Sequence, residues 1–272
     1  MSIQRDPDGR RSVRVEVEVP GTPEQVWQAI ATGPGISAWF VPTTVDGKNG
    51  GEMVCDFGGG MTSSAKITAW QPPVRFAATS PGWSPEMPPM ATEWTVEAKR
   101  GGTCIVRVVH SLFASTNDWD GQLEGTEQGW PSFFRVLRRY LQHFAGQPGA
   151  LAQAVAMTTG PAGQAWSTLA KALQRTEPRP GQQLSVALAP GVVLAGRIER
   201  IDDVGHGHTM EVLLETPAPG TLLVGAHDCG GTMVSMSAYL YGPRAEPAAA
   251  SAKPHLQTWL AARFPAPAAP SS

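Results

Sequence analysis

The chain has 272 residues and a formal net charge of −2, from 21 basic and 23 acidic side chains. Glycine and proline, with 30 and 25 residues, exceed a fifth of the chain, which excludes long helices throughout. The charge balance gives no strongly basic surface, and no stretch of eighteen apolar residues occurs. We therefore expect no nucleic-acid partner and no membrane insertion.

The three cysteines, Cys55, Cys104 and Cys229, are odd in number and form no CxxC pair. This pattern predicts neither a disulfide framework nor a structural zinc site. The arginines near the N-terminus are not followed by an apolar segment, so a secretory signal is not predicted. We expect a reduced, cytoplasmic protein with no metal and no cofactor.

The first half reads as one strand, a helix and then several strands. Residues 13–19 alternate valine with charged side chains, which is typical of a half-buried strand. Thr22, Pro23 and Glu24 then provide an N-cap, a first-turn proline and a first-turn acid. Residues 43–110 contain short strands separated by glycine and proline turns, which predicts an antiparallel meander with one wet face.

An amphipathic helix closes this half. Its apolar stripe consists of Trp130, Phe133, Phe134, Leu137, Leu141 and Phe144, and the helix is expected to open at Gly129 and Trp130. An aromatic stripe of this size requires a large apolar partner, and the curved meander is the candidate. Residues 146–149 then read as a linker.

The second half repeats the first in the same order with shrinking offsets. Pro161 and Trp166 correspond to Pro23 and Trp27, and Gly230-Gly231-Thr232 corresponds to Gly101-Gly102-Thr103. We therefore predict two domains, 1–148 and an abbreviated 149–265, followed by a disordered tail, 266–272. The second copy has room for about five strands between its two helices, and we expect Met233, Met236, Leu240 and Leu260 to fill it completely.

A set of segments in the first half resembles the START-like (SRPBCC) superfamily, and within it the family homologous to the activator of the heat-shock-protein-ninety ATPase. The matching segments are the opening strand, residues 22–27, Trp39-Phe40-Val41-Pro42, residues 92–96, residues 102–106 leading into His110, and Gly129-Trp130. The resemblance covers residues 12–146 and is much fainter in the second half.

This resemblance implies an α+β helix-grip fold, in which a curved antiparallel sheet wraps around a long C-terminal helix with a cavity between them. Members of the superfamily bind lipids, hormones, polyketides or other apolar molecules, and some catalyse cyclisation or hydrolysis. The family has no shared catalytic motif, so the resemblance assigns no catalytic residue. It favours binding of a small apolar or amphipathic ligand in the first domain.

Seven of the nine tryptophans lie before residue 150, where they could line an apolar pocket or fill the core. For Trp83, on a loop rich in Pro and Met that also holds Met87 and Met90, a lid is the alternative. The candidate ligand-binding residues are Trp39, Trp70, Trp83, Trp94, His110, Trp130, Phe133 and Phe134.

Two other function classes stay open. A cyclase, aromatase or hydrolase would need polar groups that converge on His110, for which Glu93, Thr95 and Asp56 are the candidates. A regulatory or protein-interaction module, with a possible protein partner, would instead have its first-domain cavity filled by its own tryptophans. The pairs His206/His208 and His227/Cys229 lie among turn residues and do not predict a metal site.

Overall fold

The computed structural model describes residues 3–5, 9–58, 60–81, 87–113, 119–173, 177–204, 207–228 and 231–265. The chain divides into two compact units, residues 1–146 and 147–272. Each unit is described separately below. The segment 266–272, expected as a tail, lies outside the described residues.

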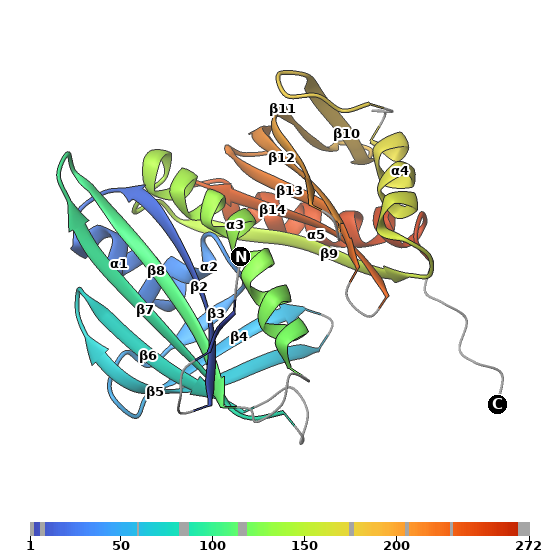
Figure 1. Cartoon of the computed structure of the whole chain (residues 1–272). Helices are drawn as coiled ribbons and strands as arrows, with labels where there is room; N and C mark the ends of the chain where they lie inside the picture. The colour runs from blue at the N-terminus through green and yellow to red at the C-terminus, as the bar shows by residue number, and fades with distance from the viewer. Residues whose placement is uncertain are drawn as a thin grey trace. The chain divides into compact units, whose positions relative to one another are not determined.

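The first unit contains an eight-stranded antiparallel sheet in the order β1-β2-β8-β7-β6-β5-β4-β3, with a long closing helix (Figure 1). Its elements are β1 (Gln4–Arg5), β2 (Arg10–Pro20), α1 (Pro23–Ala31), α2 (Gly33–Ser37), β3 (Thr43–Val45), β4 (Glu52–Gly58), β5 (Met61–Gln71), β6 (Arg75–Ser80), β7 (Met90–Lys99), β8 (Thr103–Phe113) and α3 (Asp120–His143).

The second unit contains a six-stranded antiparallel sheet in the order β10-β11-β12-β13-β14-β9. Its elements are β9 (Gly149–Thr158), α4 (Ala162–Ala172), β10 (Gln183–Ala189), β11 (Val192–Val204), β12 (Gly207–Thr216), β13 (Gly220–Asp228), β14 (Thr232–Tyr241) and α5 (Ala245–Ala261).

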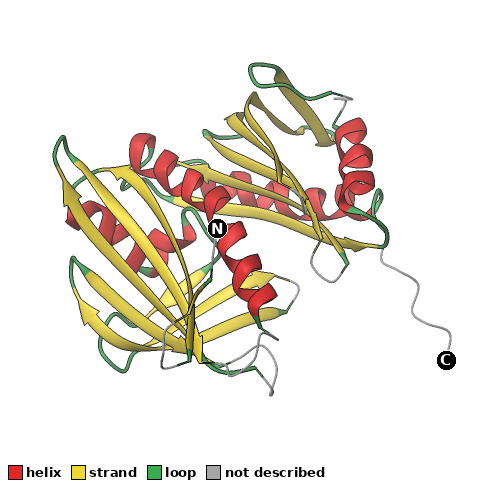
Figure 2. Ribbon diagram, in the orientation of Figure 1, coloured by secondary structure: helices red, strands yellow, loops and turns green. Residues whose placement is uncertain are grey.

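The two units share one topology. In both, the strand before the first helix, β2 or β9, pairs with the last strand, β8 or β14, and a long helix ends the unit (Figure 2). Five strands lie between α4 and α5, as predicted, against six between α1 and α3. The chain is thus a duplicated α+β helix-grip protein whose second sheet has six strands in the described residues, against eight in the first.

The predicted start of the first helix is confirmed in detail. The Thr22 hydroxyl accepts from the backbone N–H of Gln25, and the Gln25 side chain accepts from the backbone N–H of Thr22. This reciprocal capping box satisfies two backbone donors that a helix leaves unpaired at its N-terminus. The helix is therefore held at the end of β2 by its own first turn.

The closing helix α3 begins at Asp120, about ten residues before the predicted opening at Gly129 and Trp130. Pro131 therefore lies inside α3, as Pro254 lies inside α5. In α3 the buried side chains of Glu127 and Leu123 lie one and two turns before Trp130 and extend its stripe toward the N-terminus. Packing of this stripe outweighs the weak helix propensity of the glycines between them.

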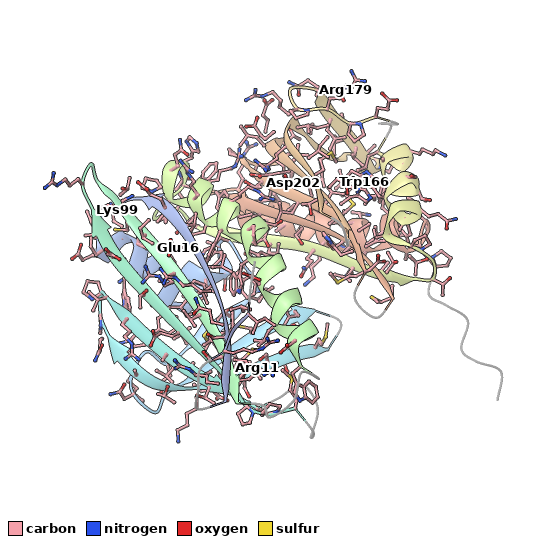
Figure 3. All side chains as sticks on the ribbon, in the orientation of Figure 1. Arg11, Glu16, Lys99, Trp166, Arg179 and Asp202 are labelled. Carbon is pink, nitrogen blue, oxygen red and sulfur yellow. The ribbon has the colours of Figure 1, made fainter. Side chains whose placement is uncertain are left out.

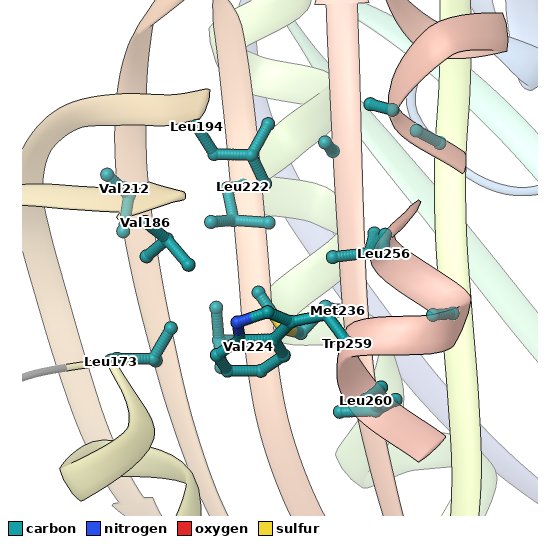
Figure 4. Close-up of a cluster of buried hydrophobic side chains, with 14 of the residues drawn as sticks. Leu173, Val186, Leu194, Val212, Leu222, Val224, Met236, Leu256, Trp259 and Leu260 are labelled. Carbon is teal, nitrogen blue, oxygen red and sulfur yellow. The ribbon is translucent and has the colours of Figure 1, made fainter. Parts of the chain in front are cut away.

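The interior of the second unit is aliphatic. Side chains from β10, β12, β13, β14 and α5 meet in one continuous core around Trp259 (Figure 4). Met236, Leu240 and Leu260 lie in this core as predicted, but Met233 does not, because β14 directs Val234 and Met236 inward and leaves Met233 half-exposed on the other face.

Charged side chains cover the outer face of the first sheet. Glu16 on β2 binds Arg14 and Arg107, and Lys99 on β7 binds Glu18, all at partly exposed positions (Figure 3). Exposed pairs of this kind contribute at most about 1 kcal/mol each. They define the wet face of the sheet, so the candidate site must be sought on the opposite face. Among the described residues, no helix is both long and apolar enough to cross a membrane.

Candidate functional site

The inner face of the first sheet carries a continuous cluster of aromatic rings. Trp94 on β7 lies at the centre, with ring centroids 5.1 Å from Trp130 and 6.1 Å from Trp39. Phe134 on α3 and Phe76 on β6 each lie 6.0 Å from Trp94. All five rings are buried, so the cluster joins the sheet to both the helical segment after β2 and the closing helix.

His110 connects this cluster to the sheet through two hydrogen bonds. The indole Nε1–H of Trp130 donates to His110 Nε2 at 2.7 Å. The other ring nitrogen, Nδ1, lies 2.9 Å from the hydroxyl oxygen of Thr92, the cross-strand partner of His110 on β7. His110 is 6% exposed, so both ring nitrogens are paired within the protein.

Burial keeps this imidazole neutral. Desolvation lowers the pKa of His110 to about 4, because the charged form loses its hydration inside the unit. An imidazolium would also place an N–H at Nε2 against the N–H of Trp130. The arrangement therefore excludes a charged His110 at neutral pH.

The cluster ends at a rim of three half-buried phenylalanines from three different elements. Phe40 follows α2, Phe57 lies on β4 and Phe133 lies on α3. The Phe40 ring lies 4.7 Å from Phe133 and 5.8 Å from Phe57, and it stacks on Trp130 at 5.3 Å. We call Phe40, Phe57 and Phe133 the aromatic rim.

The opposite end of the cluster packs against backbone. Trp70 on β5 contacts Trp27 at 5.0 Å and Phe76 at 5.7 Å. Its ring lies directly over Gly47, where a Cβ atom would come within 2.6 Å of the indole. This close approach shows that Trp70 packs against the loop before β4, at a distance from the aromatic rim.

The structure brings most of the predicted ligand-binding residues into one cluster. Trp39, Trp94, Trp130 and Phe134 are buried within it, His110 is bonded to it, and Phe133 and Trp70 lie at its two ends. Trp83 lies outside the described residues. Contact of these residues with a ligand stays a prediction.

Sequence reasoning missed Phe40, Phe57 and Thr92. Phe40 lies inside a segment that carried the family resemblance, and Phe57 has the same parity along β4 as the buried Cys55. Strand alternation and that resemblance were the signals that could have identified the two phenylalanines. Thr92 required the register between β7 and β8, which no single-sequence pattern provides.

The polar groups suggested as partners of His110 in an enzyme do not converge on it. Glu93 lies opposite Val109, not His110, and its carboxylate accepts from Arg75. Thr95 has the same parity as Glu93, so it also lies on the outer face. Asp56 is exposed and accepts from the backbone N–H of Gly58. Strand alternation turns Glu93 and Thr95 away from the imidazole, so these residues are not the polar partners of His110 that the enzyme alternative needs.

The two methionines of the loop rich in Pro and Met have different surroundings. Met87 is buried and packs with Val13, Leu112 and Leu123, while Met90 begins β7. Met87 thus belongs to a small apolar cluster near the start of α3.

The histidines of the second unit do not form a metal site with the residues described. His208 stacks on Trp166 at 5.5 Å, and the neighbouring strand's His227 lies near the Thr209 hydroxyl. The part of the chain that the structure describes contains no group of three or more His, Cys, Asp or Glu side chains that could hold a metal. His206 and Cys229 lie outside the described residues.

Comparison with solved structures gives several similar proteins. The protein MLL2253 from Mesorhizobium loti is 22% identical with a TM-score of 0.45, over 48% of this chain and 97% of that one. DynU16, a putative protein in the dynemicin biosynthetic locus, is 17% identical with a TM-score of 0.44, over 95% of this chain and 97% of that one. The di-domain ARO/CYC protein BexL is 16% identical with a TM-score of 0.41, over 93% of this chain and 94% of that one.

No curated protein matches the chain. A family model does match, over residues 20–142, and its description is Activator of Hsp90 ATPase homolog 1-like protein. The matched range runs from the end of β2 to the last turn of α3, and so includes the aromatic cluster, His110 and the aromatic rim. The first unit of this chain is therefore similar to the Activator of Hsp90 ATPase homolog 1-like proteins.

Proposed function

We propose that the first unit binds a small apolar or amphipathic molecule at the aromatic rim, between α3 and the strand β4. The observation that carries this proposal is the rim itself, in which Phe40, Phe57 and Phe133 come from three elements and none is fully buried. Apolar surface left in water costs free energy, about 25 cal/mol per Å2. A ligand that covers these rings recovers that cost.

The hydrogen bonds of the polar groups in this unit support ligand binding rather than catalysis. His110 and Trp130 are paired with each other, and Trp39 Nε1–H donates to the backbone carbonyl of Ala29 at 2.9 Å. The Thr43 hydroxyl likewise donates to the carbonyl of Val41. A ligand group inserted here meets aromatic faces, so the inserted part is apolar and polar groups of the ligand remain at the rim.

The second unit has a different role in this proposal. Its interior is filled by aliphatic side chains and Trp259, so we assign it a structural role without a ligand of its own. Ligand binding is then a property of the first unit alone.

The test is a fluorescence titration with N-phenyl-1-naphthylamine, an uncharged probe that brightens in apolar sites. Wild-type protein should bind it, and Phe133→Ala should raise the Kd about ten-fold through lost ring contact. Trp166→Ala, which removes a half-buried ring from the second unit, is the matched control and should leave the Kd unchanged. Thermal melts confirm that both variants are folded.

Two results would overturn the proposal. One is a Kd that does not respond to Phe133→Ala in a folded variant. The other is loss of binding in Trp166→Ala, which would place the site in the second unit.

A further inference from the structure

Thr92, His110 and Trp130 form a chain of hydrogen bonds that crosses three elements, β7, β8 and α3. The two ring planes of His110 and Trp130 lie within 16° of each other. Nε1 of the indole and Nε2 of the imidazole are 2.7 Å apart, which is a short N–H···N hydrogen bond. The proposed function gives this chain of hydrogen bonds no role in selecting the ligand.

The position of each proton in the chain follows from the donor groups. An indole nitrogen only donates, so His110 Nε2 must be the accepting, unprotonated nitrogen. In a neutral imidazole the proton is then on Nδ1, which donates to the Thr92 hydroxyl oxygen at 2.9 Å. The Trp130 N–H therefore selects the tautomer of His110, and the Thr92 hydroxyl, which can donate or accept, accepts the remaining N–H of that tautomer.

This bond fixes the orientation of the Trp130 ring. Its single N–H reaches His110 in one ring orientation, and any other orientation leaves a buried donor and a buried acceptor unpaired. In the observed orientation one face of the indole lies against Phe40 at an interplanar angle of 25°, and Trp94 meets it edge to face at 87°. The hydrogen-bond chain thus fixes the plane of Trp130, and the face of Trp130 supports the ring of Phe40 in the aromatic rim.

We propose that Thr92 and His110 are positioning residues that hold Trp130, and through it the stacked ring of Phe40 in the aromatic rim, in a fixed plane, and that this fixed rim ring makes the site prefer flat ring systems over flexible alkyl chains. The inference rests on the proposed function and adds the class of ligand. A fixed aromatic face stacks on another flat ring with a defined geometry. A flexible alkyl chain has no ring face, so a fixed ring adds little to its binding energy.

The test compares two competitors that displace N-phenyl-1-naphthylamine, 1-naphthol and 1-decanol. They have equal numbers of carbon atoms and one hydroxyl each, but one is flat and the other flexible. Wild-type protein should bind 1-naphthol more tightly. His110→Leu, which removes the acceptor, should reduce this preference about five- to ten-fold. His110→Gln, whose amide oxygen can accept from Trp130, should retain most of it.

Thr92→Val provides a second variant that keeps the imidazole and removes only the acceptor of its Nδ1–H. It should shift the preference in the same direction as His110→Leu. Thr95→Val makes the same chemical change on the outer face of β7 and should leave the preference unchanged. If His110→Leu does not fold, Thr92→Val against Thr95→Val decides the question.

The failures of the two proposals are distinguishable. Absence of probe binding that depends on Phe133 removes the proposed function and this inference together. Binding that depends on Phe133, with an equal loss of both competitors in His110→Leu and Thr92→Val, would show that the chain has only a structural role. An unchanged preference in these variants would also overturn the positioning role.

Discussion

The carboxylate of Asp228, at the end of β13, accepts a hydrogen bond at 3.1 Å from the backbone N–H of Ala162, the first residue of α4 and 66 positions away. The helix begins after Pro161, whose side chain offers no cap. The first unit performs the same task locally with Thr22. The second copy has therefore replaced a local cap by a tertiary one.

This replacement predicts the effect of Asp228→Ala. The variant leaves the first N–H of α4 without its acceptor and removes one of the two acceptors within reach of the Thr232 hydroxyl, the other being the carbonyl of Gly160. We expect the second unit to lose about 0.5–2 kcal/mol of unfolding free energy in urea titrations. Asp203→Ala, at an exposed position on β11, should cost less than half a kcal/mol. Equal effects of the two substitutions would show that the cap is not used.

Trp130→Ala should destabilise the first unit by about 3–5 kcal/mol, because the ring is buried and contacts Trp39, Trp94 and Phe134. Urea unfolding followed by tryptophan fluorescence measures this loss, since most tryptophans lie in the first unit. The transition of the second unit should not move. A change below about 1 kcal/mol would mean that Trp130 does not anchor α3.

The first unit should lose stability between neutral pH and pH 4.5. The pKa of His110 is lowered to about 4 in the folded protein, while an unfolded histidine titrates near its ordinary value. The unfolded chain thus binds more protons in this window, so the stabilising contribution is complete above about pH 6.5 and falls as the pH drops toward 4.

The expected loss is about 2–3 kcal/mol at pH 4.5. It is measured as the difference in unfolding free energy between pH 7 and pH 4.5, which should be smaller by this amount in His110→Gln. His208→Gln, in the second unit, is the control and should behave as wild type. An unchanged pH dependence in His110→Gln would show that the imidazole is hydrated and titrates normally.

The segment around Gly146 should be the preferred site of limited proteolysis. The chain divides between Gly146 and Gln147, and the residues around that point are exposed. A protease of broad specificity should release a fragment that ends near residue 147 and keeps its own melting transition. Cleavage confined to residues 81–89, with the whole chain melting as one unit, would argue for a single fused domain.

Much of the fold follows from local sequence patterns. Alternation predicted the strand around Val13–Val19, and the turn signals predicted the five strands of the second copy. The start of α3 could not be predicted, because it depends on burial of the weakly helical, glycine-containing turns around Leu123 against the rest of the unit. Helix propensity carries no information on such tertiary contacts. The start of α5 lies in an alanine-rich run, whose high helix propensity was a usable signal.

The candidate site was predictable in composition but not in geometry. The concentration of tryptophans and the stripe of α3 indicated an aromatic interior. The pairing of His110 with Thr92 depends on strand register, and the meeting of Phe40 with Phe133 depends on how the segment after α2 packs against α3. These are long-range relationships, so a single sequence leaves them open.

The most direct test of ligand binding in the first unit is a titration of 15N-labelled protein with 1-naphthol, followed through the indole N–H signals. The signals of Trp130 and Trp39, assigned with single Trp→Phe variants, should shift progressively while those of Trp166 and Trp259 stay in place. Shifts confined to Trp166 or Trp259 would place binding in the second unit, and no shifts at saturating 1-naphthol would contradict a ligand site at the aromatic rim.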